Sequence, residues 1–247
     1  MLRWFRPSGF PIHDNPHVID AILNLVFPAG CVLCGSRVTQ WRSGALCPKC
    51  EGSFRRQEPP FCLRCGLPEE NVDPLCGACL LGETCFDFAR SALVFDEPVR
   101  SAIHHFKYND RVSLARPLGR CLSDCLREAP FTAGVVVPVP LHRKRERQRG
   151  YNQAALLARR LGLEVREDLV RRRRPTATQT GLTRRQRVEN VRGAFECPRR
   201  VPGACLVVDD VMTTGATINE VARVLRKTGA CRVEVLTLTR VGTRPLR

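Results

Sequence analysis

Apolar runs and amphipathic stretches alternate along the C-terminal two thirds of the chain. The near-continuous apolar runs are typical of strands buried on both faces, and the amphipathic stretches between them predict helices. We expect strands at Ala89–Phe95, Val135–Val139, Cys205–Asp209 and Arg232–Thr239. Helices are expected after Asp96, from about Ser113, and over Tyr151–Leu161 and Ala216–Lys227. This alternation predicts an α/β fold with a mostly parallel sheet flanked by helices.

The helix expected near Ser113 carries two cysteines on its apolar stripe. The residues that recur there at helical spacing are Leu114, Leu118, Cys121, Leu122 and Cys125. Because the two thiols share a face with three leucines, we expect them to be packed core thiols rather than metal ligands.

The cysteines are distributed unevenly, and this marks the domain boundaries. Nine of the fourteen cysteines lie between Cys31 and Cys85. The change in composition divides the chain into an N-terminal tail (1–30), a Cys-rich module (31–82) and a larger C-terminal domain (86–240).

The sequence contains no segment that predicts a membrane span or a secretory signal. No apolar run approaches the roughly 18–20 residues that cross a bilayer. The apolar stretch Ile19–Phe27 contains Asp20 and Asn24, unlike the core of a signal peptide. We therefore expect a cytoplasmic protein, in which the cysteines serve as metal ligands or buried thiols before they form disulfides.

Four C-x-x-C pairs follow one another in the Cys-rich module. They are Cys31/Cys34, Cys47/Cys50, Cys62/Cys65 and Cys76/Cys79. Two such pairs supply the four thiolates of a closed tetrahedral site, so the spacing predicts a double zinc ribbon with two structural zinc ions. A redox motif or a disulfide scaffold is the alternative, although a redox C-x-x-C normally occurs once, beside a βαβ unit. We expect the pairs to combine in chain order, with crossed pairing as the alternative.

The segment Leu206–Thr217 predicts a phosphate site. An apolar strand leads to two adjacent carboxylates, Asp209 and Asp210, and then to a loop that runs directly into a helix. The loop residues are Thr213, Thr214, Gly215, Ala216 and Thr217. Free backbone N–H groups, hydroxyls and a helix N-terminus suit a phosphate monoester, and the paired carboxylates suit vicinal hydroxyls or hydrated Mg²⁺. The alternative is an ordinary strand–turn–helix capped by threonine.

This strand, acidic pair and T-T-G-x-T loop resemble the phosphoribosyl-pyrophosphate (PRPP) motif of type I phosphoribosyltransferases. Further matching segments are Phe106-Lys-Tyr108, Pro138–Arg143, Arg149–Ala154 and Thr178–Phe195. Together with the Cys-rich start, they resemble the ComF competence-protein family over about residues 28–240. The resemblance implies a type I phosphoribosyltransferase-like sheet preceded by the zinc ribbon, a PRPP ligand carrying Mg²⁺, and a role in DNA uptake. It also implies a helicase-type partner of the competence machinery.

The resemblance also implies roles for individual residues. Asp209 and Asp210 would bind the ribose hydroxyls, the loop from Thr213 would bind the 5′-phosphate, and Leu141, His142 and Arg143 would bind pyrophosphate. Residues 175–192 would form a flap, in which Thr183 and Gln186 predict a capping box for a helix over Leu182–Asn190. The implied catalytic residues are Asp209, Asp210, Arg143, Arg185 and Arg187, the arginines stabilising the leaving pyrophosphate.

Most of the net charge of +16 is concentrated between residues 141 and 200, where Arg and Lys exceed Asp and Glu by 12. The three clusters are 143–149, 171–174 and 184–187, and Tyr151 adjoins the first. A groove for single-stranded nucleic acid would use such charges and a stacking ring. Pyrophosphate binding or arginine-rich genome composition would explain them equally well. Besides a PRPP-dependent enzyme, the sequence therefore leaves a non-catalytic adaptor for single-stranded DNA and a competence partner.

Overall fold

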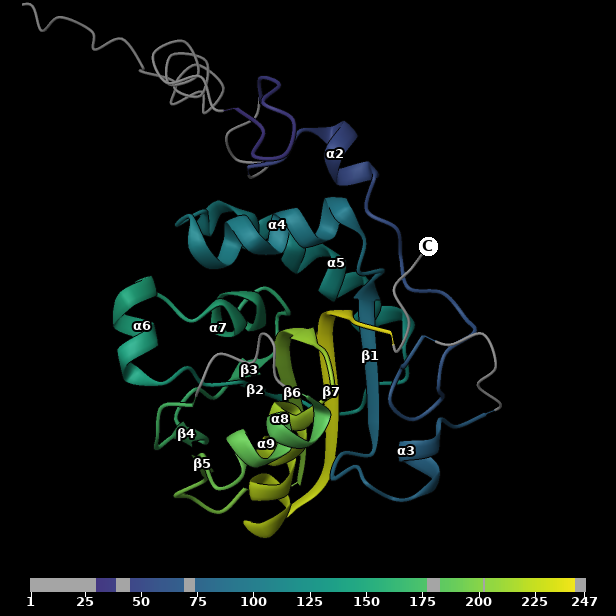
Figure 1. Cartoon of the computed structure of the whole chain (residues 1–247), viewed down its shortest axis with the longest axis vertical. Helices are drawn as coiled ribbons and strands as arrows, with labels where there is room; N and C mark the ends of the chain where they lie inside the picture. Colours follow the sequence, from purple (N-terminus) through teal and green to yellow (C-terminus); the bar gives the residue numbers. More distant parts are fainter. Residues whose placement is uncertain (1–29, 39–44, 69–73, 177–182, 202, 243–247) are drawn as a thin grey trace, which may run out of the picture.

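The computed structural model is a five-stranded sheet covered by helices on both faces (Figure 1). It describes residues 30–38, 45–68, 74–176, 183–201 and 203–242. The sheet has the order β1-β7-β6-β2-β3, and every neighbouring pair of strands is parallel. The strands are β1 (Phe88–Leu93), β2 (Val135–Pro138), β3 (Glu164–Val165), β6 (Gly203–Met212) and β7 (Ala230–Arg240). The predicted α/β class is confirmed.

Alternating side chains of β6 divide the core into two halves. Cys205 and Val207 pack on the face covered by α9 (Ala216–Lys227), whereas Leu206 and Val208 pack on the opposite face. The helices on that opposite face are α4 (Glu97–Tyr108), α5 (Ala115–Glu128) and α7 (Gln153–Ala158). Each half consists of fully buried aliphatic side chains, so the sheet is apolar on both faces as its valine-rich strands predict.

The predicted helices occur where their patterns placed them. The helix after Asp96 buries Val99, Ala102, Ile103 and Phe106, and α9 has the predicted bounds. Two differences are important for the site. Strand β6 continues three residues beyond Asp209, and α6 (Arg143–Arg149) forms where no helix was expected.

Helix α6 has no buried residue, so it carries no apolar stripe that sequence periodicity could detect. It is instead defined by its ends. His142 accepts a hydrogen bond from the Lys144 N–H at the start, and Gly150 adopts φ 80° at the end.

The Cys-rich module packs along the edge strand β1. The Gln57 N–H donates to the Ala92 carbonyl at 3.0 Å, and the Val94 N–H donates to the Arg55 carbonyl at 2.9 Å. The module thereby covers a strand edge that would otherwise expose unpaired backbone groups. Its two short helices are α2 (Pro48–Gly52) and α3 (Gly77–Leu80).

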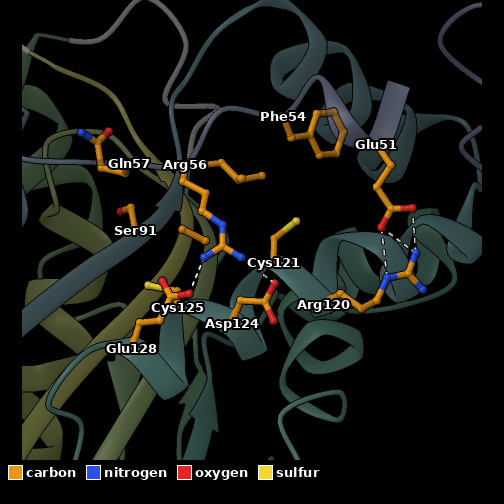
Figure 2. Close-up of a pocket in the computed structure, with 12 residues that line it drawn as sticks. Glu51, Phe54, Arg56, Gln57, Ser91, Arg120, Cys121, Asp124, Cys125 and Glu128 are labelled. Atoms are coloured by element: carbon orange, nitrogen blue, oxygen red, sulfur yellow. Dashed lines mark hydrogen bonds and ion pairs between the residues drawn. The ribbon is translucent and has the colours of Figure 1, made fainter. Parts of the chain in front are cut away.

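A cavity of about 280 Å³ lies between this module and α5 (Figure 2). Cys121 and Cys125 line it and are half-buried, and Arg56 crosses it to pair with Asp124 and Glu128. Burial raises the pKa of each of these two thiols to about 11. They contact the core as predicted, although at its rim.

The remaining described elements follow the sheet strands β2 and β3. Strands β4 (Arg171–Arg172) and β5 (Phe195–Glu196) form a small antiparallel pair, and α8 (Arg184–Val191) lies between them in sequence. A 3₁₀ turn, η2 (Val112–Leu114), precedes α5. In the part of the chain described, the helices are too short or too polar to cross a bilayer.

Candidate functional site

The predicted phosphate loop lies between the end of β6 and the start of α9. Gly215 adopts φ 77°, and a Cβ added there would come within 2.7 Å of the Met212 methyl group. Glycine is therefore required both by the backbone conformation and by the packing beneath the loop. Thr214 accepts a long hydrogen bond of 3.4 Å from the Ala216 N–H. The twelve-residue helix α9 begins here, so its N-terminal N–H groups face the loop.

The two aspartates differ in burial and in partners. Asp210 is buried, and its Oδ2 lies 2.8 Å from the Nζ of Lys107 on α4. Asp209 is half-buried, and its Oδ1 accepts the Asp210 N–H at 2.9 Å. Burial and the negative charge of Asp210 raise the pKa of Asp209, while the charge of Lys107 opposes this. One carboxylate is thus paired and the other remains under-compensated.

The predicted pyrophosphate loop follows β2. Leu141 and His142 are half-buried, Arg143 is exposed, and together they line a cavity with residues of β4. Asn152, at the start of α7, donates to the Val139 carbonyl at 3.1 Å and so fixes the loop on its strand. Sequence reasoning did not single out Asn152, because its role depends on a contact thirteen residues away.

The flap helix α8 reaches the phosphate loop. The predicted capping box is present, with the Gln186 N–H donating to Thr183 Oγ1 and the Thr183 N–H donating to Gln186 Oε1. Arg187 Nη1 donates to Thr213 Oγ1 at 2.9 Å, which joins flap and loop. Arg185 is 90% exposed and pairs with Glu189 on its own helix at 3.1 Å. Flap residues 177–182 lie outside the described residues.

The structure therefore brings part of the predicted site together. Asp209, Asp210, the phosphate loop and Arg187 lie at one edge of the sheet, where the parallel strands end. Arg185 does not join them. Lys107 does, although only its place in Phe106-Lys-Tyr108 could have signalled it from the sequence.

The ring that adjoins the first basic cluster is Tyr108 rather than Tyr151. The Tyr151 hydroxyl donates to the Phe106 carbonyl and its ring packs on that of Phe106, so the suggestion that Tyr151 stacks on a base is wrong. Tyr108 is 64% exposed, and the Arg149 guanidinium lies 5.3 Å from its ring centroid.

The eight C-x-x-C cysteines form two clusters in chain order. One comprises Cys31, Cys34, Cys47 and Cys50, and the other Cys62, Cys65, Cys76 and Cys79. Within each cluster the sulfurs lie within 4.8 Å of one another, and one Sγ–Sγ distance in each is 3.6 Å. Thiolates bound tetrahedrally to zinc at about 2.3 Å lie roughly 3.8 Å apart, so both clusters fit zinc. The sequential pairing is confirmed.

The two clusters differ in burial. Every cysteine of the second cluster is buried in the core half beneath α9, together with Met212 and Ala216 of the phosphate-loop region. In the first cluster Cys34 is exposed, and the buried cysteines contact the other core half. The zinc ribbon therefore packs into the cores of the larger domain.

Comparisons with known proteins agree with this architecture. Residues 22–80 match the family model of a double zinc ribbon domain, and residues 119–247 match that of a phosphoribosyl transferase domain. The fold and the loop thus define a double zinc ribbon joined to a phosphoribosyltransferase domain. Over 227 residues the chain is 34% identical to Competence protein F of Haemophilus influenzae, covering 85% of this chain and 96% of that one.

Two further relatives support a closer assignment. The chain is 34% identical to DNA utilization protein YhgH of Escherichia coli, covering 87% of this chain and 99% of that one. It is 27% identical to Competence protein ComFC of Bacillus subtilis, covering 85% and 94%. The chain belongs to the ComF family of competence proteins.

Proposed function

We propose that this protein binds PRPP with Mg²⁺ at the carboxyl edge of its sheet. The observation that carries the proposal is the convergence of three elements there: the phosphate loop, the aspartates and flap residue Arg187. A ligand that combines a phosphate monoester, vicinal hydroxyls and a diphosphate requires such a set. The matching phosphoribosyl transferase family model supports the same reading.

Each part of the ligand has a natural counterpart. The N–H groups and hydroxyls from Thr213 to Thr217 would bind the 5′-phosphate. Asp209 and Asp210 would accept hydrogen bonds from the ribose hydroxyls, with Lys107 holding Asp210 in place. The loop Leu141–Arg143 would face the diphosphate. Bound Mg²⁺ would supply charge neutralisation on the diphosphate oxygens.

The chemistry open to such a complex is phosphoribosyl transfer. The bond from C1 to the diphosphate oxygen breaks with its electron pair on the diphosphate, and C1 then bonds to an acceptor nucleophile that loses its proton. Positive charge developing on the ribose and negative charge on the leaving group require opposite charges from the protein. The aspartates and the arginines of the first loop and flap would supply them.

The biological setting we propose is the handling of DNA during uptake, since the similar proteins are named for competence and for DNA utilization. We place the protein in the cytoplasm, because fourteen free thiols and two tetrathiolate clusters require a reducing compartment. A helicase-type competence protein is the partner we propose there.

Calorimetric titration of Mg²⁺ and PRPP tests the proposal. We expect the wild type to bind, and Asp209→Asn with Asp210→Asn to weaken affinity by about two to four decades, because two charge-assisted bonds of roughly 1.5–3 kcal/mol each are lost. Asp168→Asn is the control, since this exposed carboxylate pairs with Arg166 and Arg199 away from the loop. Absence of PRPP binding by the wild type would overturn the proposal, and a pyrophosphate-release assay decides whether binding leads to turnover.

A second function, binding of single-stranded DNA by a non-catalytic adaptor, is favoured by the surface of α6 and α4. Helix α6 has no buried residue and carries five basic side chains, and Tyr108 stands exposed beside Arg149. Phosphates would bind along α6 while a base stacks on Tyr108. We expect Tyr108→Ala to weaken binding of an oligonucleotide by about 1–3 kcal/mol without changing its salt dependence. Loss of salt dependence instead would show that the ring only supports Arg149.

A further inference from the structure

The predicted pyrophosphate loop and strand β4 enclose a cavity of about 680 Å³. Its lining is dominated by charge: five arginines and three glutamates. The arginines are Arg143, Arg147, Arg171, Arg172 and Arg173. A volume of this size accommodates a small organic phosphate, and an excess of guanidinium groups favours an anion.

Arg172 differs from its neighbours in the run 171–174. Arg171, Arg173 and Arg174 are exposed, whereas Arg172 is half-buried. Arg173 pairs with Glu196 at 3.2 Å, and Arg174 donates to the Arg192 carbonyl at 2.7 Å. Three members of this basic run therefore have the solvation or the partners of ordinary surface arginines.

The guanidinium of Arg172 is held in place but not fully satisfied. Its Nη2 donates to Thr176 Oγ1, and its plane lies against Phe195, 5.3 Å from the ring centroid. Its Nε is buried and has no hydrogen-bond partner among the described residues. Arginine carries five N–H donors and does not lose its proton in proteins, so a buried donor left over costs free energy.

The charges around Arg172 explain what would satisfy it. Burial lowers the pKa of this guanidinium, the positive charge of Arg145 lowers it further, and the negative charge of Asp209 opposes both. Arg172 thus lies within electrostatic range of the acidic pair as well as of the first basic cluster. A cation in this position is destabilised by its own protein and would be stabilised by an anion in the adjoining cavity.

We propose that Arg172 binds the diphosphate group of the ligand, which lies in the cavity between Leu141–Arg143 and β4. This rests on the proposed function for the identity of the ligand, and it goes beyond it in assigning a binding residue and a place for the diphosphate. The planar guanidinium donates two parallel hydrogen bonds to phosphate oxygens, including one from the Nε that the fold leaves unpaired. Phe195 and Thr176 preset its orientation.

The test compares Arg172→Met with Arg171→Met in the full-length, zinc-loaded protein. Both changes remove one positive charge and keep the side-chain length, but Arg171 is exposed. Affinities for Mg²⁺-PRPP and for inorganic pyrophosphate with Mg²⁺ are measured by calorimetry at fixed ionic strength. We expect Arg172→Met to weaken both by about 10- to 100-fold, Arg171→Met to weaken them less than about threefold, and Arg172→Lys to lie between.

Several outcomes would overturn the assignment. Unchanged affinities in Arg172→Met would do so, as would equal losses in Arg171→Met, which would reduce the effect to net charge. If Arg172→Met does not fold, the Arg172→Lys variant decides, because unchanged pyrophosphate affinity there excludes a bidentate contact. A wild type that binds neither probe overturns both proposals.

The failure of this inference is distinguishable from that of the proposed function. Pyrophosphate binding that depends on Arg172, without PRPP binding, would leave the diphosphate site standing and remove PRPP as its ligand. PRPP binding that survives Arg172→Met would retain the proposed function and remove Arg172 from it.

Discussion

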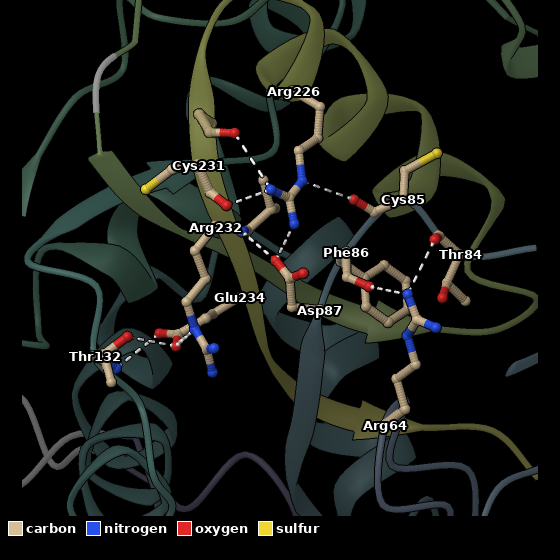
Figure 3. A network of polar contacts seen from close by, with 12 residues as sticks. Arg64, Thr84, Cys85, Phe86, Asp87, Thr132, Arg226, Cys231, Arg232 and Glu234 are labelled. Carbon is tan, nitrogen blue, oxygen red and sulfur yellow. Dashed lines mark hydrogen bonds and ion pairs between the residues drawn. The ribbon is translucent and has the colours of Figure 1, made fainter. Parts of the chain in front are cut away.

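Two groups of buried carboxylates lie at opposite edges of the same sheet, and they are satisfied very differently. At the amino edge, Glu234 on β7 is fully buried and accepts four hydrogen bonds (Figure 3). The donors are the Thr132 N–H and hydroxyl, the Ala133 N–H and the Arg232 guanidinium, all within 3.0 Å. These bonds outweigh the effect of burial and lower the pKa of Glu234.

At the carboxyl edge the balance is reversed. Asp209 is less buried than Glu234, yet burial and the neighbouring Asp210 raise its pKa. Arg172 nearby has a buried Nε without a partner in the described structure. Lys107 compensates Asp210 alone.

The difference separates charges that hold the fold together from charges that await a ligand. A buried charge surrounded by fixed donors stabilises the native state, whereas one left under-compensated lowers stability until something binds. Residues at functional sites commonly carry this cost. The amino edge is thus a structural network, and the carboxyl edge has the electrostatic character of a binding site.

The zinc clusters test the satisfied side of this comparison where the expected effect is largest, because their eight thiolates depend on the metal for compensation. We expect about two zinc ions per chain by elemental analysis, and a loss of several kcal/mol of stability on Cys65→Ser, since structural zinc binding is folding free energy. Cys65 belongs to the fully buried cluster. Cys34→Ser, in the exposed position of the first cluster, should destabilise the protein less.

Zinc content and urea unfolding measured on both variants decide this point. Equal losses would mean that burial of the second cluster in the core beneath α9 adds nothing. A wild type with one zinc ion or none, after reconstitution under reducing conditions, would contradict the double ribbon.

Replacing Glu234 by Gln should have the next largest effect. The amide keeps the shape but removes the charge and turns an NH₂ group toward N–H donors, so we expect a loss of about 3–5 kcal/mol in the free energy of unfolding. Glu164→Gln is the matched control, because Glu164 is 62% exposed and lies 3.6 Å from Arg166. Urea denaturation should show a clear shift of midpoint for the first variant and almost none for the second; similar midpoints would remove the structural role of Glu234.

Much of the carboxyl edge could be predicted from the sequence, because its signals are local. The strand, the acidic pair, the phosphate loop and the start of α9 occupy one continuous segment, and the capping box of α8 spans four residues. The four C-x-x-C pairs and their zinc clusters are equally local.

The rest depends on contacts between distant parts of the chain. Lys107 reaches Asp210 across 103 positions, and the Glu234 network joins residues about a hundred positions apart. Arg172 looks like its neighbours in a run of four arginines, and only packing against Phe195 distinguishes it. Helix α6 escaped detection because a fully exposed helix has no hydrophobic period.

At the carboxyl edge, changing the two aspartates singly should give opposite effects on stability. Asp210→Asn leaves Lys107, which is 20% exposed, without its counter-charge, so we expect a loss of about 1–2 kcal/mol. Asp209→Asn removes an under-compensated charge, and its melting temperature should equal or slightly exceed that of the wild type. Calorimetric melting at pH 7 without ligand checks both, and destabilisation of similar size would place Asp209 among the structural charges.

The smallest effect, and the most direct measure of the difference between the edges, is the pH dependence of stability. Glu234 has a folded pKa below its unfolded value, so its stabilising contribution is present above about pH 4.3 and is lost as the pH falls through the folded pKa. Asp209 has the opposite sign. Its folded pKa lies above the unfolded value of about 3.9, so the native state binds more protons and stability falls as the pH rises through that window.

The Asp209→Asn variant isolates this contribution, because an amide does not titrate. We expect the variant to gain stability relative to the wild type as the pH rises from 5 toward 8, by about 1 kcal/mol or less after allowance for partial exposure of the carboxylate. The difference between wild type and Glu234→Gln should instead stay constant over that range and shrink only in acid. Urea unfolding at half-unit pH intervals, at constant ionic strength, measures both differences. A constant difference for Asp209→Asn as well would mean that Asp209 is as fully compensated as Glu234, and the distinction between the two edges would fail.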